Sequence, residues 1–347
     1  GHIPIVEPGL EQLVGEGVES GHLSFEHGSG PTVRTADFVF LCVPTPQQED
    51  GSADLGYVIA AAHEIGPLLR PDTIVVNKST VPVGSFHVVA DALDRDDVSV
   101  VSNPEFLREG SAIHDFLHPD RVVIGSDDKR SAERLAELYA PLNSEIIFTD
   151  PASAELIKYA ANGFLAMKIS FINSVAAVCE EVGADILSVV EGIGSDSRIG
   201  RSFLHPGPGW GGSCFPKDSR ALVSIAADHG YDFSLMRGVI DTNEHQIDRI
   251  VDKVRGAIGN GAQPATVGVL GLTFKAGTDD LRESPSLRIA SRLMEHGVAI
   301  RGYDPTVSLP LTDVQQRELE GIEIAQSPID AAQGADAIVI LTEWPEF

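Results

Sequence analysis

The sequence predicts an α/β protein in which two parallel-sheet regions flank an all-helical region. In two parts of the chain, short apolar runs typical of buried strands alternate with segments of helical apolar spacing. Between these parts, from Ala152 to Ile258, the segments with periodic apolar residues have helical spacing, and none has the pattern of a strand. Alternation of strand and helix is typical of parallel sheets with helices on their faces.

The first region contains four expected strands. The run 37–43 is continuous and apolar, and Pro44-Thr45-Pro46 closes it. The other strands are expected at 73–76, 98–101 and 122–124, and the helices at 10–18, 55–69 and 84–93. Ligands of such sheets bind at the carboxyl ends of the strands. The segments that follow the strands, 44–46, 79–80 and 103–109, are therefore expected to meet at one edge.

The middle region opens with one long helix. Its helical spacing runs from Ala152 to about Val182, a length of about 45 Å, which is enough to connect two domains. Further helices are expected at 185–192, 218–229 and 234–258. The second α/β region follows the loop 259–264, with strands at 265–274, 298–302 and 337–341 and a helix at 287–296. We therefore expect three domains, at residues 1–150, 151–260 and 261–347.

Both ends of this organisation are expected to be incomplete. A dinucleotide-binding sheet normally opens with a strand, a Gly-x-Gly-x-x-Gly turn and a helix, and no such turn precedes Asp37. The sequence is thus expected to lack its first β-α-β unit. It also stops shortly after a strand, so its C-terminal end is expected to be missing too.

Composition narrows the function classes. The formal net charge of −26 over 347 residues argues against a nucleic acid or an anionic membrane as partner. No run of 18 apolar residues occurs, so we expect no membrane span. The three cysteines have no metal-ligand spacing, and no secretory signal is present, which favours a cytoplasmic protein without a metal site.

The stretch 209–218, Gly-Trp-Gly-Gly-Ser-Cys-Phe-Pro-Lys-Asp, is the candidate centre of the chemistry. Its glycines let the backbone approach a ligand closely. Cys214 is followed by Lys217 and Asp218, and a nearby ammonium favours the nucleophilic thiolate. The alternative is a small buried cysteine in a glycine-rich turn, but its neighbours are not apolar. We expect a shaped loop over 204–212 and a helix that begins near Asp218.

Five motifs occur along the chain: Ser-Thr-Val-Pro-Val-Gly at 79–84, Asn-Pro-Glu-Phe-Leu-Arg-Glu-Gly at 103–110, Glu-Leu-Ile-Lys-Tyr-Ala-Ala-Asn at 155–162, Gly-Gly-Ser-Cys-Phe-Pro-Lys-Asp at 211–218 and Gly-Leu-Thr-Phe-Lys at 271–275. In these motifs and in their order, the chain resembles the UDP-glucose/GDP-mannose dehydrogenase family of nucleotide-sugar 6-dehydrogenases. The resemblance implies two Rossmann-like domains joined by the long helix, and NAD as the cofactor.

The resemblance also implies a reaction. Two NAD⁺ remove four electrons from a sugar C6 alcohol, giving a carboxylate through a cysteine thiohemiacetal and a thioester. Covalent catalysis of this kind splits one difficult step into easier ones. UDP-glucose is the implied substrate, with UDP-glucuronate as product. Phe215 and Gly110 favour UDP-glucose over GDP-mannose, and GDP-mannose and UDP-N-acetylmannosamine are the alternative substrates.

Catalytic roles follow from the same resemblance. Cys214 is the implied nucleophile, while Lys158 and Asn162 stabilise oxyanions. Asp218 and Thr80 order a water, and Glu105 is the candidate base for hydrolysis. Whether Asp218, Lys158 or water accepts the proton of the first oxidation stays open. From spacing alone, Lys158 and Asn162 would form a solvated helix face.

Binding roles are implied as well. Arg198 resembles an arginine that reaches the site of a neighbouring subunit and pairs with the diphosphate of the substrate, so the protein is expected to be a homodimer or a higher homo-oligomer. The implied cofactor contacts are Thr45, Thr80, Glu109, Lys217 and Arg282. The other implied substrate contacts are Phe106, Leu107, Arg108, Glu109, Lys158, Phe203, Leu204, His205, Pro206, Gly207, Gly211, Phe274 and Lys275.

Two readings from other classes compete with this one. A cysteine hydrolase would need a histidine base, yet His205 and His229 belong to no recognisable arrangement. A catalytically inactive sugar-nucleotide-binding protein would bind a UDP-sugar but not NAD, and the absent glycine turn keeps this alternative open.

Overall fold

The computed structural model describes residues 3, 5–48, 50–259 and 265–347, and it forms two compact units. Unit 1 contains Glu7–Ala161 and Arg220–Asp232, and unit 2 contains Asn162–Ser219 and Phe233–Phe347. The division passes through two helices, α7 (Pro151–Val182) and α9 (Phe215–Asp228). Most of the expected loop 259–264 lies outside the described residues.

Unit 1 contains a five-stranded sheet in the order β1-β2-β3-β4-β5. Its elements are α1 (Leu10–Glu19), α2 (Gly30–Val33), β1 (Phe38–Leu41), α3 (Gly56–Ile65), η1 (Gly66–Leu68), β2 (Ile74–Asn77), α4 (Ser85–Leu93), β3 (Ser99–Ser102), α5 (Ala112–Leu117), β4 (Val122–Gly125), α6 (Lys129–Tyr139), η2 (Ala140–Leu142) and β5 (Ile146–Thr149). Each strand and helix expected in this region is present, within a few residues of its expected ends.

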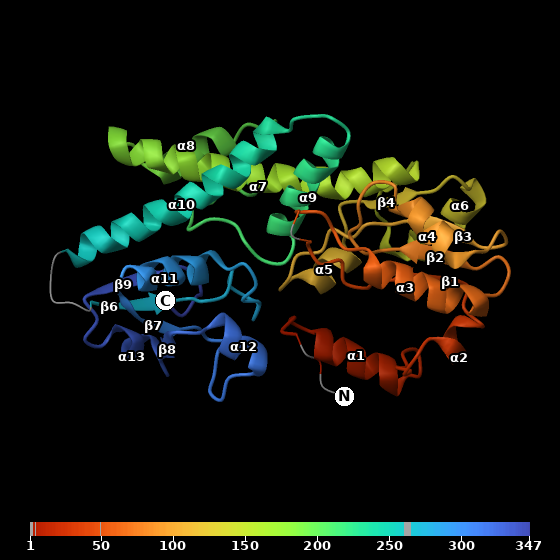
Figure 1. Ribbon diagram of the computed structural model, residues 1–347, viewed down its shortest axis with the longest axis horizontal. Helices are drawn as coiled ribbons and strands as arrows, with labels where there is room; N and C mark the ends of the chain where they lie inside the picture. Colours follow the sequence, from red (N-terminus) through yellow and green to blue (C-terminus); the bar gives the residue numbers. More distant parts are fainter. Residues whose placement is uncertain (1–2, 4, 49, 260–264) are drawn as a thin grey trace. The chain divides into compact units, whose positions relative to one another are not determined.

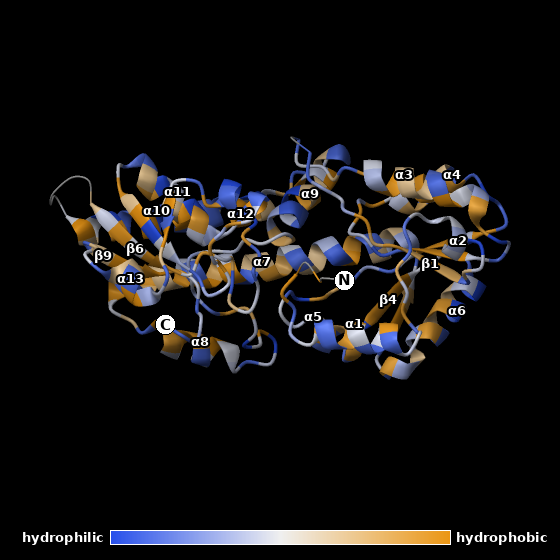
Figure 2. Ribbon diagram, turned by 90° about the horizontal axis from the view of Figure 1, so that it is seen from below, coloured by the Kyte–Doolittle hydropathy of each residue, from blue (hydrophilic) through white to orange (hydrophobic). Residues whose placement is uncertain are grey.

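Helices cover both faces of this sheet (Figure 1). In β2, Val75 packs in a core with α3 and α4, whereas Ile74 and Val76 pack in a second core with α6. All three valine and isoleucine side chains are fully buried. A strand buried on both faces has a continuous apolar sequence, which is why these strands were recognisable. In Figure 2, β4 of this sheet is coloured as hydrophobic over most of its length.

The sheet of unit 1 departs from the parallel arrangement at one position. Strands β1, β2 and β3 are parallel, and so are β4 and β5, but β3 and β4 are antiparallel through the pair Ser102↔Gly125. A parallel neighbour requires a crossover, usually a helix over the sheet face. The connection from β3 to β4 contains only the six-residue α5. The sequence analysis also missed β5, whose Phe148 is 54% exposed, so that it lacks a continuous buried pattern.

Unit 2 combines helices with a second sheet. Besides most of α7, its helices are α8 (Ile186–Gly194), the start of α9, α10 (Ser234–Ile258), α11 (Pro285–Glu295), α12 (Asp313–Glu318) and α13 (Pro328–Ala332). The sheet has the order β8-β7-β6-β9 and is parallel throughout, with β6 (Thr266–Leu270), β7 (Ala299–Tyr303), β8 (Ile322–Ile324) and β9 (Ala337–Ile340). The all-helical middle and the second α/β region are thus confirmed.

The core of the second sheet lies between its strands and two helices. Val267 and Val269 of β6 pack with Ile247 of α10 and Ile289 of α11. On the other face, α13 comes so close to the sheet that a Cβ at Gly268 would lie 2.7 Å from the carbonyl oxygen of Ala331. Only glycine permits that approach. The short elements β8, α12 and α13 were missed because each has too few residues to show a periodic pattern.

Helix α7 is long and apolar. Among the described residues it is the one helix that could cross a membrane by length and composition, and 39% of its most apolar 18-residue stretch is buried. The core helix of a soluble protein meets the same criterion. Helix α7 also carries the buried charged residues Glu155 and Lys158, which pair with groups of unit 1. These contacts are typical of a core helix.

Candidate active site

In unit 1, the loops after β1 and β2 meet at the carboxyl edge of the sheet, as expected. Thr45 Oγ1 donates a hydrogen bond of 2.8 Å to the carbonyl oxygen of Thr80. Ser79 Oγ donates to the carbonyl oxygen of Val43 at 2.7 Å. Parallel strands in register end together, so the two loops are held side by side.

A buried ion pair joins the loop after β3 to helix α7. Lys158 Nζ lies 2.7 Å from Glu105 Oε1, and the side chains are 4% and 26% exposed. The second carboxylate oxygen, Glu105 Oε2, accepts from the backbone N–H of Leu107 at 2.6 Å. Burial excludes the solvated helix face that spacing alone had favoured for Lys158. Removing either partner would leave a poorly compensated charge.

The remaining residues of the 103–110 motif are also fixed within unit 1. The Phe106 ring stacks under Arg121, whose Cζ is 3.7 Å from the ring centroid. The Arg108 guanidinium binds both oxygens of Asp115 and lowers the pKa of that carboxyl to about 2. The charge of Arg108 is therefore already paired, whereas Leu107 is 37% exposed.

Behind this loop lies a polar cluster that the sequence analysis missed. Lys78 Nζ donates to Asn103 Oδ1 at 3.0 Å, and the Tyr139 hydroxyl donates to the same oxygen at 2.7 Å. Burial lowers the pKa of Lys78 to about 8 and raises the pKa of Tyr139 to about 12. Asn103 Nδ2 donates to Val123 O at 2.7 Å and so ties the loop to β4. The only sequence signal was a lysine directly after an apolar strand.

In unit 2, the glycine-rich loop 207–213 is held by side-chain amides of α7 and α10. Asn243 accepts from the N–H of Trp210 and donates to its carbonyl, at 2.8 and 2.9 Å. Trp210 Nε1 donates to Ser170 Oγ at 2.9 Å. A Cβ at Gly211 would lie 2.0 Å from the carbonyl oxygen of Glu283. The glycine is therefore required by close packing of the backbone.

Cys214 is the residue directly before α9, which begins at Phe215. The expected start near Asp218 is wrong by three residues, because Pro216 fits the first turn of a helix, where no N–H is needed. The N–H of Asp218 donates to the carbonyl oxygen of Cys214 at 2.8 Å. The thiol therefore lies at the positive end of the helix dipole, which favours a thiolate.

Asp218 is the most buried charged group of this region, at 1% exposed. Asn162 Nδ2 donates to Asp218 Oδ2 at 2.6 Å, and Lys217 Nζ pairs with Asp218 Oδ1. Asn162 is itself 7% exposed, so it too lies away from the solvent. The structure thus brings Asn162 into contact with the first turn of α9, which contains Lys217 and Asp218 and directly follows Cys214.

The other implied ligand residues of unit 2 differ in accessibility. Phe203 has a positive φ of 63° and packs beside Phe215, with ring centroids 6.2 Å apart. Leu204 is 1% exposed, so only its backbone is available to a ligand. The Arg198 side chain is 87% exposed and pairs with Asp196. Arg282 pairs with Asp280, and Lys275 Nζ lies 5.5 Å from the Phe274 ring centroid. His205 is exposed, whereas Pro206 and Gly207 are partly buried.

The implied site residues fall into two groups. Unit 1 contains Thr45, Thr80, Glu105, Phe106, Leu107, Arg108, Glu109 and Lys158. Unit 2 contains Asn162, Arg198, Phe203, Leu204, His205, Pro206, Gly207, Gly211, Cys214, Lys217, Asp218, Phe274, Lys275 and Arg282. Within each unit, the contacts above connect residues to which the resemblance gives a catalytic role, Glu105 with Lys158 in unit 1 and Asn162 with Asp218 in unit 2.

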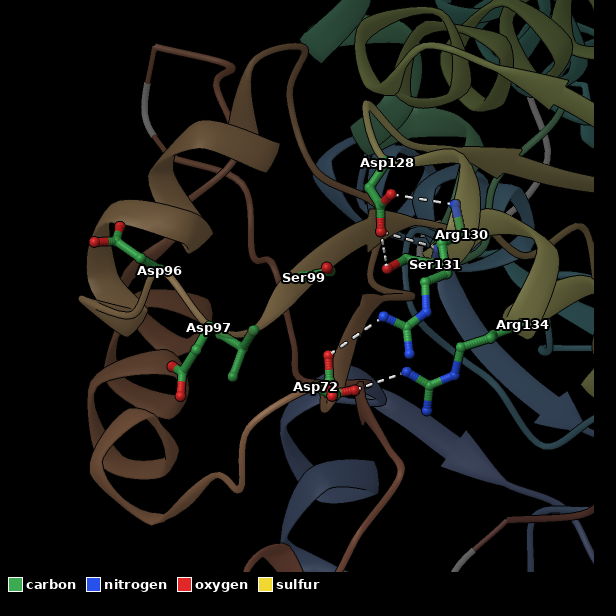
Figure 3. Close-up of a pocket in the computed structure, with 9 residues that line it drawn as sticks. Asp72, Asp96, Asp97, Ser99, Asp128, Arg130, Ser131 and Arg134 are labelled. Carbon is green, nitrogen blue, oxygen red and sulfur yellow. Dashed lines mark hydrogen bonds and ion pairs between the residues drawn. The ribbon is translucent and has the colours of Figure 1, made fainter.

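Two pockets in the described part of unit 1 bear on the location of the site. One, of about 150 Å³, lies between Asp72, at the amino end of β2, and the start of α6; there Arg130 and Arg134 point toward Asp72 (Figure 3). It contains none of the implied site residues. The other, of about 10 Å³, is lined by Asn77, Ser79, Thr80, Val81, Ser102, Pro104, Glu155 and Lys158. No cluster of ligands for a metal ion occurs among the described residues.

Three family models cover most of the chain. The NAD binding domain of the UDP-glucose/GDP-mannose dehydrogenase family matches residues 1–143, its central domain 152–245 and its UDP binding domain 268–347. The chain belongs to the UDP-glucose/GDP-mannose dehydrogenase family.

Relatives within this family share much of the sequence. A UDP-glucose 6-dehydrogenase of Rhizobium meliloti is 48% identical over 357 residues, covering 100% of this chain and 81% of the relative. A UDP-glucose 6-dehydrogenase of Bacillus subtilis is 45% identical, covering 99% and 78%. Among solved structures, a UDP-glucose dehydrogenase of Pyrobaculum islandicum superposes with a TM-score of 0.92 at 39% identity, covering 99% and 80%. The UDP-D-ManNAc dehydrogenase of Pyrococcus horikoshii has a TM-score of 0.84 at 27% identity, covering 99% and 80%.

The residues of this family member fit a nicotinamide nucleotide. The loops after β1 and β2, which carry Thr45 and Thr80, meet at the carboxyl edge, where nucleotides bind in such sheets. Beneath them, the side-chain amide of Asn77 is 2% exposed, and neither of its polar atoms has a partner among the described residues. Hydroxyl and amide groups suit the polar groups of a nucleotide. NAD as the cofactor of the family is confirmed by the matched NAD binding domain.

Proposed function

We propose that this protein oxidises C6 of UDP-glucose to the carboxylate of UDP-glucuronate. The observation that carries the proposal is the placement of Cys214 directly before α9, with the buried pair Asn162–Asp218 at the first turn of that helix. The similarity to UDP-glucose 6-dehydrogenases at 40–48% identity supports UDP-glucose as the substrate. The solved UDP-N-acetylmannosamine dehydrogenases are less similar, at 26–27%.

The reaction requires a balance of four electrons. One alcohol, one water and two NAD⁺ give one carboxylate, two NADH and three protons. NAD, when bound, accepts the hydride that leaves C6 in each oxidation. The first oxidation gives an aldehyde, and the proton of the hydroxyl leaves with the help of Asp218, Lys158 or water.

Cys214 makes the second oxidation possible. Its thiolate adds to the aldehyde carbon, so a C–S bond forms and the carbonyl oxygen becomes an oxyanion. Loss of hydride from this thiohemiacetal gives a thioester. Lys158, as an ammonium, and Asn162, as an amide donor, have the chemistry to stabilise the oxyanion. Their burial supports this role, since a donor in a dry site interacts more strongly than one in water.

Hydrolysis completes the reaction. Water adds to the thioester carbon, the C–S bond breaks, and the thiolate of Cys214 is restored. Glu105 is the proposed base, because its carboxylate is held by Lys158 and the Leu107 N–H yet is partly exposed. Asp218 and Thr80 are proposed to order the water. For substrate and cofactor binding, we propose the residues that the resemblance to the family implies.

We also propose a homodimer formed through α7. Phe164, Phe171 and Val178 are 60%, 55% and 59% exposed. Their spacing of seven places them on one stripe of the helix, with a drift of about 20° per heptad. Large apolar stripes of this kind mark protein interfaces. The exposed Arg198 would then be available to the site of the partner subunit.

We also propose a division of the chain into three domains and a cellular location. The division into a cofactor domain at 1–150, a helical dimerisation domain at 151–260 and a UDP-sugar domain at 261–347 is supported by the family matches at 1–143, 152–245 and 268–347. We place the protein in the cytoplasm, consistent with its acidic composition and a soluble cofactor.

The test is NADH formation, followed by absorbance, with UDP-glucose, GDP-mannose and UDP-N-acetylmannosamine. We expect turnover with UDP-glucose and at least about tenfold less with the other two. Binding of a UDP-sugar without NADH from any of the three would instead indicate the inactive binding protein.

A further inference from the structure

Glu155 is a buried carboxylate to which the mechanism above gives no role. It lies in the second turn of α7 and is 3% exposed. Its Oε2 accepts from the backbone N–H of Gly84 at 2.7 Å, and its Oε1 accepts from the N–H of Phe86 at 2.9 Å. The hydroxyl of Ser102 donates to Oε1 at 3.1 Å. All four residues belong to unit 1.

The bonds from the N–H groups of Gly84 and Phe86 cap the N-terminus of α4, with a side chain that belongs to another helix, α7. The first N–H groups of α4 have no partner within the helix, and its own N-cap, Gly84, has no side chain to supply one. The carboxylate of Glu155 fills that place, and its negative charge matches the positive end of the helix. Gly84 has a φ of 95°, a conformation that allows the chain to turn into α4 here.

The cap fixes the loop that carries Thr80. This loop runs from Ser79 to Gly84, and its two ends are held by different contacts. At one end the carbonyl of Thr80 accepts from Thr45 Oγ1. At the other end the N–H of Gly84 donates to Glu155. Loss of the second contact would free the Gly84 end of this loop.

The same carboxylate reaches two further parts of the candidate site. Ser102 ends β3, three residues before Glu105, so its hydrogen bond ties the start of the Glu105 loop to α7. Lys158 lies three residues after Glu155 on the same helix face. Glu155 thus connects the segments that carry Thr80, Glu105 and Lys158.

Burial raises the pKa of Glu155, while the three donors lower it. Burial of a carboxylate costs free energy unless hydrogen-bond donors compensate for it, and here two backbone N–H groups and the Ser102 hydroxyl do so. A cavity of about 10 Å³ adjoins the same groups and includes Asn77, whose amide has no described partner. That volume accommodates about one water molecule, so collapse of the loop is possible once the cap is lost.

We propose that Glu155 is a positioning residue that holds the Thr80 loop in the geometry required for turnover. The inference rests on the proposed function of Thr80. It predicts that removing the carboxylate lowers kcat through loop mobility, while the sugar-nucleotide contacts carried by unit 2 keep their strength.

The first test compares Glu155→Gln with the wild type in the full protein. Glutamine keeps the volume, but its Nε2 is a donor and would face an N–H. We expect kcat to fall by at least about tenfold while the KM for UDP-glucose changes less than about twofold. Hydrogen–deuterium exchange of the segment 80–90 is expected to become faster. Glu133→Gln, an exposed site on α6 with a 57% exposed side chain, is the matched control and should change neither measurement.

Ser102→Ala provides a second variant, since it removes one donor and leaves the cap of α4. We expect a fall in kcat of about two- to threefold, which keeps the proposal testable if Glu155→Gln does not fold. Unchanged kcat in both variants would overturn the proposal. So would a fall in kcat with unchanged exchange of 80–90.

The two proposals fail in different ways. If the wild type forms no NADH with any sugar nucleotide, the proposed function fails, and exchange alone then decides the role of Glu155: faster exchange in Glu155→Gln supports it, and unchanged exchange overturns it. If the wild type turns over and Glu155→Gln matches it in kcat and exchange, only the inference about Glu155 fails.

Discussion

The side-chain amide of Asn162 donates a 2.6 Å hydrogen bond to Asp218, four residues after Cys214. Lys217 pairs with the other oxygen of the same carboxylate, which is 1% exposed. The carboxylate is therefore fully engaged by one amide and one ammonium. This arrangement makes Asn162 a residue on which both the stability of the first turn of α9 and the proposed chemistry depend.

Replacing Asn162 with alanine should reduce both stability and turnover. The buried carboxylate of Asp218 would lose a donor, at a cost of about 1–3 kcal/mol in the free energy of unfolding. Loss of an oxyanion donor should lower kcat by about 10²-fold or more. Urea denaturation and steady-state NADH formation measure the two effects. A variant with full kcat would show that Asn162 acts in structure alone.

Lys78 is predicted to make the stability of the protein depend on pH. Burial lowers its pKa from 10.5 to about 8 in the folded state. Between these values the unfolded chain binds more protons than the folded chain, so stability rises with pH across this window. Below pH 8 the buried ammonium of Lys78 lowers the free energy of unfolding by its full amount, on the order of 3 kcal/mol for a pKa shift of this size.

Lys78→Met removes that penalty and tests it. We expect the variant to be more stable than the wild type at pH 7, with an advantage that shrinks as the pH approaches about 10. Urea denaturation at several pH values is the measurement. Lys129→Met, at a lysine whose side chain is 88% exposed, should show no such trend. A constant difference between Lys78→Met and the wild type would contradict the assignment.

The sequence predicted the order of the main elements because their patterns are strong. The strands at 74–77 and 99–102 are apolar runs between polar loops, and α10 matches its expected limits, Ser234 and Ile258. The antiparallel pairing of β4 was not predictable, because the direction of a strand depends on the path of the preceding connection. A periodic pattern does not encode that path.

The candidate site was predictable only in part. The motifs identified Cys214, Lys158 and Asp218, but not the contacts Lys158–Glu105 and Asn162–Asp218. Each of these contacts joins residues more than 50 positions apart, a separation that spacing rules do not reach. For the same reason Glu155 and Lys78 received no role. Their partners come from distant loops and strands.

Phe171→Glu tests the proposed dimer face. A charge in an apolar interface is costly, so the variant should be monomeric at concentrations where the wild type is dimeric. Light scattering after size-exclusion chromatography measures the mass. Leu138→Glu, on an exposed position of α6, is the control and should remain dimeric. A dimeric Phe171→Glu would place the interface elsewhere.

Arg198→Ala tests the proposed contact with the diphosphate of the substrate. Charge-assisted hydrogen bonds contribute about 1.5–3 kcal/mol, so we expect the affinity for UDP-glucose to fall by about 10- to 100-fold. Calorimetry with the full dimeric protein measures this change. Arg201→Ala, at an arginine paired with Glu191 and 63% exposed, is the matched control. Equal affinities for Arg198→Ala and the wild type would remove Arg198 from the site.

The central claim is that Cys214 forms the covalent intermediate of a four-electron oxidation. The most direct measurement is the number of NADH formed per UDP-glucose consumed, in the wild type, in Cys214→Ser and in the control Cys179→Ser. We predict two for the wild type and for the control. Cys214→Ser should give at most one, because a serine hydroxyl is a poorer nucleophile than a thiolate. Two NADH per UDP-glucose from Cys214→Ser would contradict the account.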